Sequence, residues 1–168
     1  GEIALKAWLD RAAGVPPFFV IDSPARLQQL AADLGLTVPV QAINKPGDAA
    51  ACFATALPVL ALSRGVEARA GKPETATAAA VIESIERAVQ LAQSGDASAL
   101  VTNPIQKSVL TAAGFAHPGH TEFLAALAGA GAEAVMMLAC TELRVVPVTI
   151  HVALAEVART LTGDKIIY

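Results

Sequence analysis

The sequence predicts an α/β fold with a mixed, mostly parallel sheet flanked by helices. Short apolar segments alternate with amphipathic helical patterns along the chain, which is typical of this class. Of the 168 residues, 54% are hydrophobic and only 4% are aromatic, so we expect a core of closely packed Ala, Val, Leu and Ile. No apolar run reaches the roughly 18 residues of a membrane-spanning helix.

Helix and strand signals follow one another in the first hundred residues. An apolar stripe predicts a helix over 2–13, which ends at Gly14. Ser23 and Pro24 place a capping hydroxyl and a proline at the start of a second helix, which runs to about residue 34. An Ala-rich amphipathic segment predicts a long helix over 74–94. Short apolar segments predict strands at 18–21, 37–43 and 58–62.

The long helix has an apolar stripe for the core and a polar side for solvent. The stripe consists of Ala78, Val81, Ile82, Ile85, Val89 and Leu91. The polar side consists mainly of Glu83, Glu86, Arg87 and Gln90, to which we assign no function.

The last seventy residues continue the alternation. Apolar segments predict strands at 99–102, 134–140 and 144–150, and helical patterns predict helices at 105–113, 121–127 and 154–161. Only residues 141–143 separate the last two strands. Such a short link is typical of a hairpin, which is why we expect the sheet to be mixed rather than wholly parallel.

Charge and cysteine content narrow the range of partners. The formal net charge is -3 and Lys and Arg do not cluster, so the electrostatic footprint of a nucleic-acid-binding protein is absent. Cys52 and Cys140 lack metal-type spacing, and neither a signal peptide nor a disulfide pattern is visible. We expect a cytoplasmic protein that acts on small molecules, without a nucleic-acid or membrane partner and with both thiols buried.

Polar groups able to bind a ligand gather where the 99–102 strand passes into the following helices. Ligands of open α/β folds bind at such strand ends. Gly119 allows close approach of the backbone, and Thr121 lies at a helix start, where free N–H groups and the helix dipole attract anions. The alternative is that Thr121 only caps its helix and that His120 only shapes the turn.

Four sequence blocks resemble one known family in their order and spacing. They are Thr102-Asn-Pro-Ile-Gln-Lys107, His117-Pro-Gly-His-Thr-Glu-Phe123, Glu142-Leu-Arg144 and His151. They resemble the 4-hydroxythreonine-4-phosphate dehydrogenase family of vitamin B6 synthesis, whose fold is similar to that of isocitrate and isopropylmalate dehydrogenases. Members of that family are about twice as long, so we expect this chain to cover roughly the amino-terminal half. Residues 1–100 would then belong to a first α/β domain, and residues 101–168 would start a second one with the substrate and metal site and the dimer interface.

The resemblance implies roles for four residues. His120 and Thr121 match a pair that contacts substrate, and Lys107 either contacts substrate or holds a loop carboxylate. His151 matches a ligand of a divalent metal (Zn, Mg, Co, Mn or Ni), which the family holds at a dimer interface together with two later histidines. Without the resemblance, a lone histidine after a strand is more often structural. No catalytic residue and no cofactor-binding residue is assigned.

Five neighbouring polar residues are expected to have structural roles. Thr102 and Asn103 can donate hydrogen bonds into the cleft, but both residue types commonly end strands for local reasons, and we favour that interpretation. Glu142 and Arg144 are expected to brace the strand that precedes His151, in preference to a direct catalytic role. His117 is expected to lie on the surface of its loop.

The reaction implied by the resemblance is oxidation of 4-phosphooxy-L-threonine by NAD or NADP with a divalent metal, followed by decarboxylation, in pyridoxal 5'-phosphate biosynthesis. The metal would stabilise the alkoxide that forms as the hydroxyl proton departs. Two alternatives stay open: a paralogous dehydrogenase of another phosphorylated hydroxy acid or of a cis-dihydrodiol carboxylate, and a non-catalytic anion-binding module for the isolated chain. A phosphate acyltransferase on a related fold is disfavoured, because it needs no histidine at position 151. The resemblance also implies a homodimer whose sites are shared between protomers, and the chain alone is expected to bind the metal weakly.

Overall fold

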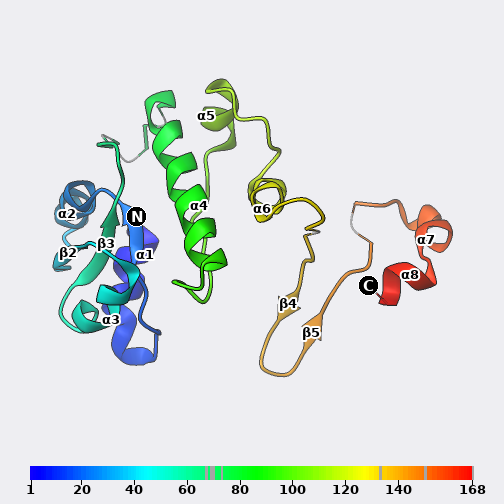
Figure 1. The fold of residues 1–168 in the computed structure, drawn as a ribbon, viewed down its shortest axis with the longest axis horizontal. Coiled ribbons are helices and arrows are strands. Elements are labelled where there is room, and N and C mark those ends of the chain that lie inside the picture. Colours follow the sequence, from blue (N-terminus) through cyan, green and yellow to red (C-terminus); the bar gives the residue numbers. More distant parts are fainter. Residues whose placement is uncertain (67, 69–70, 73, 133, 150, 168) are drawn as a thin grey trace. The chain divides into compact units, whose positions relative to one another are not determined.

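The computed structural model describes residues 1–66, 68, 71–72, 74–132, 134–149 and 151–167. The chain divides into two compact units, Gly1–Ala130 and Gly131–Tyr168, each of which is described by itself (Figure 1). The domain boundary near residue 100 that the resemblance implies stays a prediction.

A three-stranded parallel sheet organises the first unit. Its strands are β1 (Val20–Asp22), β2 (Val40–Ile43) and β3 (Leu57–Ala61), in the order β1-β3-β2. Val59 of the central strand lies opposite both Val20 and Ala42. Because the three strands run in the same direction, their carboxyl ends meet at one edge of the sheet.

Helices cover both faces of this sheet (Figure 1). They are α1 (Glu2–Leu9), α2 (Pro24–Asp33), α3 (Ala49–Cys52) and α4 (Ala78–Gln93), with the 3-10 turns η1 (Asp10–Ala13), η2 (Pro46–Asp48) and η3 (Thr75–Thr77) along the chain. Two further helices, α5 (Lys107–Ala112) and α6 (His120–Ala128), follow α4, and α6 packs against α4. Successive residues of β3 point to opposite faces. Leu57 and Val59 pack against apolar residues of α1 and α2, whereas Leu60 packs against residues of α3 with Leu91 of α4 beside them.

Trp8 attaches α1 to the rest of the core. Its side chain is 3% exposed, and the indole Nε1 donates a hydrogen bond of 2.8 Å to the carbonyl oxygen of Phe53. Arg11 covers the ring, with its guanidinium carbon 3.7 Å from the ring centre. The large ring therefore fills the core while its one polar group stays paired.

Pro58 lies in the central strand, where proline is unusual because it has no N–H to donate. The amide of Leu57 donates a hydrogen bond of 2.8 Å to the carbonyl of Pro39, on the side of β2. Successive backbone amides of a strand face alternate neighbours, so the nitrogen of Pro58 faces the side of β1. Pairing with β1 begins only at Val59, opposite Val20, so the proline costs the sheet no ladder hydrogen bond.

The predicted order of elements in the first unit is confirmed except at two places. The sequence did not predict α3, a single turn between β2 and β3. The strand predicted at 99–102 is wrong, because these residues form no strand and Val101 is 92% exposed. A strand needs a neighbour for its backbone groups, and no described strand runs beside this segment.

Half of the apolar stripe that was predicted for the long helix is buried, and its other members, Val81, Ile82 and Leu91, are half-buried. Ala78, Ile85 and Val89 are buried, and so is Ala80. The helix proper starts at Ala78, because Thr75–Thr77 form the 3-10 turn η3.

The second unit contains a small antiparallel ribbon followed by two helices. β4 (Leu138–Ala139) pairs with β5 (Arg144–Val145) in a sheet of its own, and α7 (Leu154–Thr160) and α8 (Gly163–Ile167) follow. The predicted hairpin is confirmed, although its strands are shorter than 134–140 and 144–150; position 150 lies outside the described residues. The helix predicted at 154–161 is confirmed, and α8 was not predicted.

The two thiols differ in environment. Cys52 is buried as expected, and burial raises the pKa of its thiol. Cys140 is exposed, so the expectation that both thiols are buried is wrong for this residue. It directly follows β4, in a ribbon whose strand residues are all exposed.

Among the described helices, none is both long enough and apolar enough to cross a membrane.

Leu27→Ala is expected to lower the free energy of unfolding by about 2 to 5 kcal/mol, because truncating a fully buried leucine leaves a cavity. The matched control is Leu34→Ala at the end of the same helix, where the side chain is 38% exposed and the loss should be about 1 kcal/mol or less. Urea unfolding followed by circular dichroism measures both. Equal losses in the two variants would contradict the assignment of Leu27 to the core.

Ser23→Ala is expected to lower the free energy of unfolding by about 1 kcal/mol, because the Ser23 hydroxyl accepts the Arg26 amide hydrogen at the start of α2. Ser23→Asn keeps a capping acceptor and should stay close to the parent protein. The same urea titration applies, and an asparagine variant as unstable as the alanine variant would argue against capping as the cause.

Candidate functional site

Lys107 is placed at the beginning of α5. The preceding residues, from Thr102 to Gln106, form no helix or strand, and Gln106 is the extended N-cap residue. Leu110, which is 2% exposed, fixes the helix in the core, so the lysine side chain on the first turn is left exposed. The structure therefore keeps its ammonium group accessible to a ligand.

The other predicted substrate residues lie at the start of α6. His120 and Thr121 are its first two residues, and the N-cap residue is Gly119, in an extended conformation. In the described part of the chain no side chain caps this helix, so the alternative in which Thr121 is the cap is wrong. First-turn N–H groups of an uncapped helix lack partners within the helix and attract negative charge.

The side chain of Lys107 reaches the N-terminus of α6. A Cβ atom placed on Gly119 would lie 3.6 Å from both Cε and Nζ of Lys107, and 3.4 Å from Oε2 of Glu122. The Lys107 ammonium group, the N-terminus of α6 and the Glu122 carboxylate therefore lie close together around Gly119, which has no side chain to separate them. This arrangement keeps both predicted roles of Lys107 open, because either a ligand anion or Glu122 can be its partner.

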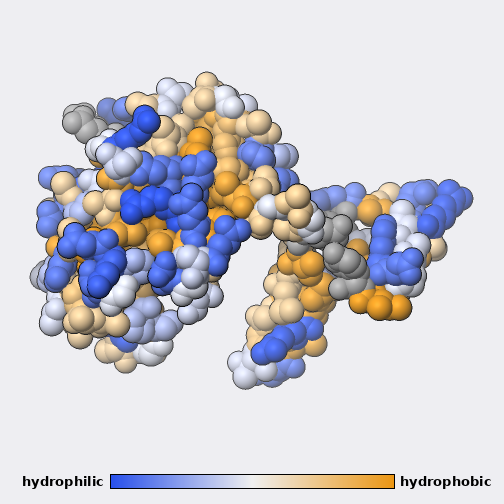
Figure 2. Space-filling model, viewed as in Figure 1, coloured by the Kyte–Doolittle hydropathy of each residue, from blue (hydrophilic) through white to orange (hydrophobic). Residues whose placement is uncertain are grey.

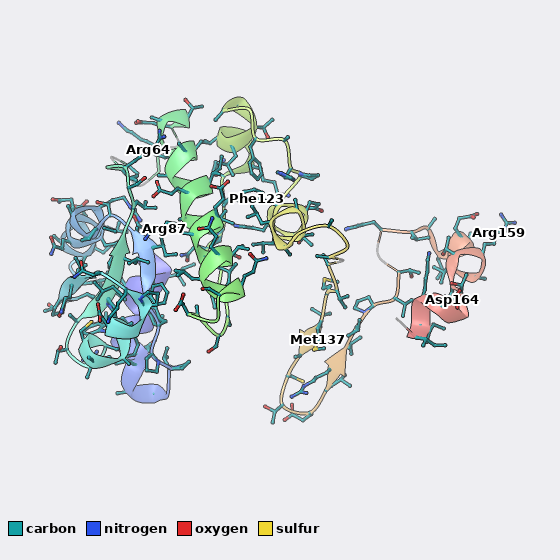
Figure 3. All side chains as sticks on the ribbon, viewed as in Figure 1. Arg64, Arg87, Phe123, Met137, Arg159 and Asp164 are labelled. Atoms are coloured by element: carbon teal, nitrogen blue, oxygen red, sulfur yellow. The ribbon has the colours of Figure 1, made fainter. Side chains whose placement is uncertain are left out.

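An aromatic cluster holds the loop between α5 and α6 in place. The ring of His117 lies 5.0 Å from Phe123 and 5.2 Å from Phe115, and the two phenylalanine rings meet edge to face at 4.9 Å. Phe123, labelled in Figure 3, is 6% exposed. The expectation that His117 lies on the loop surface is therefore wrong, since its half-buried ring packs against both phenylalanines.

A second polar region, which the sequence did not predict, lies at the carboxyl ends of β1 and β3. Arg87 of α4 donates a hydrogen bond of 2.6 Å to the carbonyl of Ala61 (Figure 3). One turn earlier, Glu83 accepts a hydrogen bond of 2.6 Å from the amide of Ser63, which lowers the pKa of the Glu83 carboxyl. These two residues therefore hold the chain that leaves β3 and do not simply face solvent. The sequence contained one indication of this shared role: Glu83 and Arg87 are four residues apart, which places both on one side of a helix.

A hollow of about 200 Å³ lies beside these strand ends. Its lining includes Asp22 and Arg26, which form an ion pair that raises the pKa of the Arg26 guanidinium. The hydroxyls of Thr77 and Ser84 donate to the carbonyls of Glu74 and Val81. Because the polar side chains of this hollow are paired with other protein groups, it offers a ligand less than the start of α6 does.

His151 lies in the second unit, on a bend and not at the end of a regular strand. β5 ends at Val145, and His151 is exposed with φ at 56°, the only positive φ of a non-glycine residue in the part of the chain that the structure describes. Such left-handed conformations are uncommon for residues with a side chain. The geometry presents the imidazole to solvent.

The described residues do not form a metal site on their own. In the ranges given above, no three His, Cys, Asp or Glu side chains lie close enough together to hold one ion. His151 alone does not satisfy a divalent metal, which needs several protein ligands. We therefore assign no reaction step to a metal.

Four of the expected structural roles are not observed. Glu142 and Arg144 are exposed, and within the described ranges their side chains make no hydrogen bond or ion pair, so the brace before His151 is absent. Thr102 and Asn103 are also exposed and likewise lack side-chain hydrogen bonds there. Their local role depended on a strand that does not form.

Comparison with known proteins identifies relatives along nearly the whole chain. Residues 15–168 match the family described as pyridoxal phosphate biosynthetic protein PdxA. Proteins named 4-hydroxythreonine-4-phosphate dehydrogenase are similar: the one from Methylorubrum populi is 56% identical over 172 residues (98% of this chain, 49% of that protein). The one from Xanthobacter autotrophicus is 45% identical over 171 residues (99% and 49%).

Solved structures support the same relationship. A 4-hydroxythreonine-4-phosphate dehydrogenase from Burkholderia phymatum matches with a TM-score of 0.82 at 29% identity, covering 98% of this chain and 50% of that chain. One from Klebsiella pneumoniae matches with a TM-score of 0.79 at 28% identity, covering 98% and 51%. The α/β fold is thus confirmed, and the chain spans about half the length of the relatives that it matches. The chain belongs to the PdxA family of pyridoxal phosphate biosynthetic proteins.

Proposed function

We propose that this family member acts in the oxidation of 4-phosphooxy-L-threonine during pyridoxal 5'-phosphate biosynthesis, with NAD or NADP as hydride acceptor. The observation that carries the proposal is the 56% identity, over 98% of this chain, to a protein named 4-hydroxythreonine-4-phosphate dehydrogenase. The meeting of Lys107 with the start of α6 adds a position suited to an anionic substrate.

The chemistry is a two-electron oxidation. The hydrogen on the secondary alcohol carbon leaves as hydride for the nicotinamide, the hydroxyl proton goes to solvent or a base, and a ketone forms. The product is a β-keto acid, which then loses CO2. A divalent metal would supply positive charge to the reacting oxygen, provided that further ligands complete its site. We propose His151 as one of its ligands.

The proposed contribution of the described residues is to bind and orient the substrate. The Lys107 ammonium group and the free N–H groups of the first turn of α6 together attract a phosphate or a carboxylate. Each helix-end interaction contributes roughly 0.3 to 1 kcal/mol when exposed. His120 and Thr121 add side-chain hydrogen-bonding groups at the same end, and the aromatic cluster packs the loop before them against Phe123 of the same helix.

A second candidate applies to the 168 residues alone, which would then be a non-catalytic anion-binding module. It is favoured by the position of the Lys107 ammonium group at the start of α6, which suits an anion with or without a reaction. A paralogous dehydrogenase of another phosphorylated hydroxy acid or of a cis-dihydrodiol carboxylate would use the same residues. The resemblance of the sequence blocks supports the further proposal of a homodimer with shared sites, and the cysteine pattern supports the proposal of a cytoplasmic protein.

A protein of family length that contains these residues is expected to reduce NAD or NADP with 4-phosphooxy-L-threonine and to release CO2. Spectrophotometric detection of the reduced nicotinamide, together with CO2 trapping, measures both steps. Residues 1–168 alone serve as the control and should show no turnover. Turnover confined to an unphosphorylated diol would rule out the B6 assignment in favour of a paralogue.

Lys107→Met in that longer protein is expected to reduce kcat/KM for the phosphorylated substrate by about tenfold, mainly through KM, because about 1.4 kcal/mol of anion binding is lost. Lys107→Arg keeps the positive charge and should retain most of the activity. The double variant Lys107→Met with Glu122→Gln separates the two roles of the lysine. If the double variant restores KM, Lys107 serves only to neutralise Glu122 and does not contact substrate.

A further inference from the structure

Two opposite charges lie beside Gly119 at the start of α6 without pairing with each other. The Lys107 ammonium nitrogen is 3.6 Å, and the Glu122 oxygen Oε2 is 3.4 Å, from the position that a Cβ atom of Gly119 would occupy. Both charged residues are exposed, whereas Gly119 is buried. Among the ion pairs of the described residues, none joins Lys107 to Glu122. The start of α6 therefore presents a cation and an anion close together to solvent.

The carboxylate of Glu122 needs an explanation, because it repels any anionic ligand at this end of the helix. Glu122 is the third residue of α6, a position from which a glutamate can accept the amide hydrogen of the N-cap residue Gly119. The structure describes both residues and contains no such hydrogen bond between them. Attraction to the positive end of the helix favours a carboxylate in the first turn, but it leaves the carboxylate oxygens free to accept hydrogen bonds from a ligand.

A ligand at this place is selected by its charges. The face of the first unit that Figure 2 shows mixes hydrophilic and hydrophobic residues. On such a surface, a few placed polar groups fix the orientation of a small ligand. A ligand that carries an anionic group and an ammonium group a few bonds apart satisfies both residues at once. Its anion accepts hydrogen bonds from Lys107, and its ammonium group donates to Glu122. A ligand without an ammonium group leaves the carboxylate without a partner.

We propose that Glu122 determines substrate specificity by accepting a hydrogen bond from the α-ammonium group of the substrate, while Lys107 holds a neighbouring carboxylate or phosphate. This inference rests on the proposed function and deepens it, because it narrows the substrate class to hydroxy acids that also carry an amino group. 4-Phosphooxy-L-threonine belongs to this class. A phosphorylated hydroxy acid without an amino group does not, and neither does a cis-dihydrodiol carboxylate.

Two substrates test the proposal in a protein of family length that contains these residues. They are 4-phosphooxy-L-threonine and its counterpart without the amino group, 3-hydroxy-4-phosphooxybutanoate. We expect kcat/KM of the parent protein to be at least about tenfold higher for the amino compound. Glu122→Gln keeps the shape of the side chain and removes its charge. It should lose about tenfold in kcat/KM with the amino compound, mainly through KM, and less than about twofold with the other compound.

Two further variants serve as controls. Glu122→Asp keeps the charge on a shorter side chain and should retain part of the preference. Glu86→Gln removes one negative charge from an exposed position of α4 without an assigned function, and it should leave the preference unchanged. The ratio of the two kcat/KM values within one variant does not depend on the fraction of active protein. Should Glu122→Gln fail to fold, as judged by circular dichroism, a preference of Glu122→Asp as large as that of the parent would contradict the proposal.

Three results in the substrate comparison would overturn the proposal. They are the absence of a preference in the parent protein, an equal loss with both compounds in Glu122→Gln, and a gain with both compounds. An equal loss would mean that Glu122 only supports the helix, and a gain would mean that it only neutralises Lys107. If neither compound is oxidised, the proposed reaction has failed, and isothermal titration calorimetry then measures the same preference as a ratio of dissociation constants. Equal constants, or no binding of either compound, would overturn this inference as well.

Discussion

Burial of the central strand β3 on both faces is the constraint on which the first unit depends. Leu57 and Val59 require cover from α1 and α2, and Leu60 requires cover from α3 and α4. A parallel sheet is stable only when both faces are shielded in this way. Once these helices are in place, Arg87 and Glu83 of α4 reach the end of β3 and hold the chain that leaves it.

Local signals were sufficient for most of the fold. The cap at Ser23, the stop at Gly14 and the amphipathic pattern of α4 all depend on neighbours within a few residues, and the structure has each of them. The failures involve distant partners. Apolar content near Val101 predicts a strand, yet strand formation requires a second strand alongside, which periodicity does not reveal.

The candidate site shows the same limit. The sequence located His120 and Thr121 at a helix start, and the structure places them there. It did not reveal that Lys107, twelve residues before Gly119, brings its ammonium group against that glycine. Nor did it reveal that His117 packs against two phenylalanines, since loop residues with a proline and a glycine beside them are typical of a surface. Which side chains of separate helices lie close together depends on how the helices pack. The spacing of residues along the sequence does not show this.

Pro58 has a consequence for how the sheet is aligned. A strand that is apolar on both faces buries about as much apolar surface after a two-residue slip along its neighbour as before it. The reason is that a two-residue slip keeps every side chain on its own face. In β3, such a slip of β1 toward Leu57 would oppose a carbonyl to a nitrogen that carries no hydrogen. The proline therefore disfavours a slip in that direction, and in the observed alignment Asp22 lies opposite Ala61, so β1 and β3 end at the same level of the sheet.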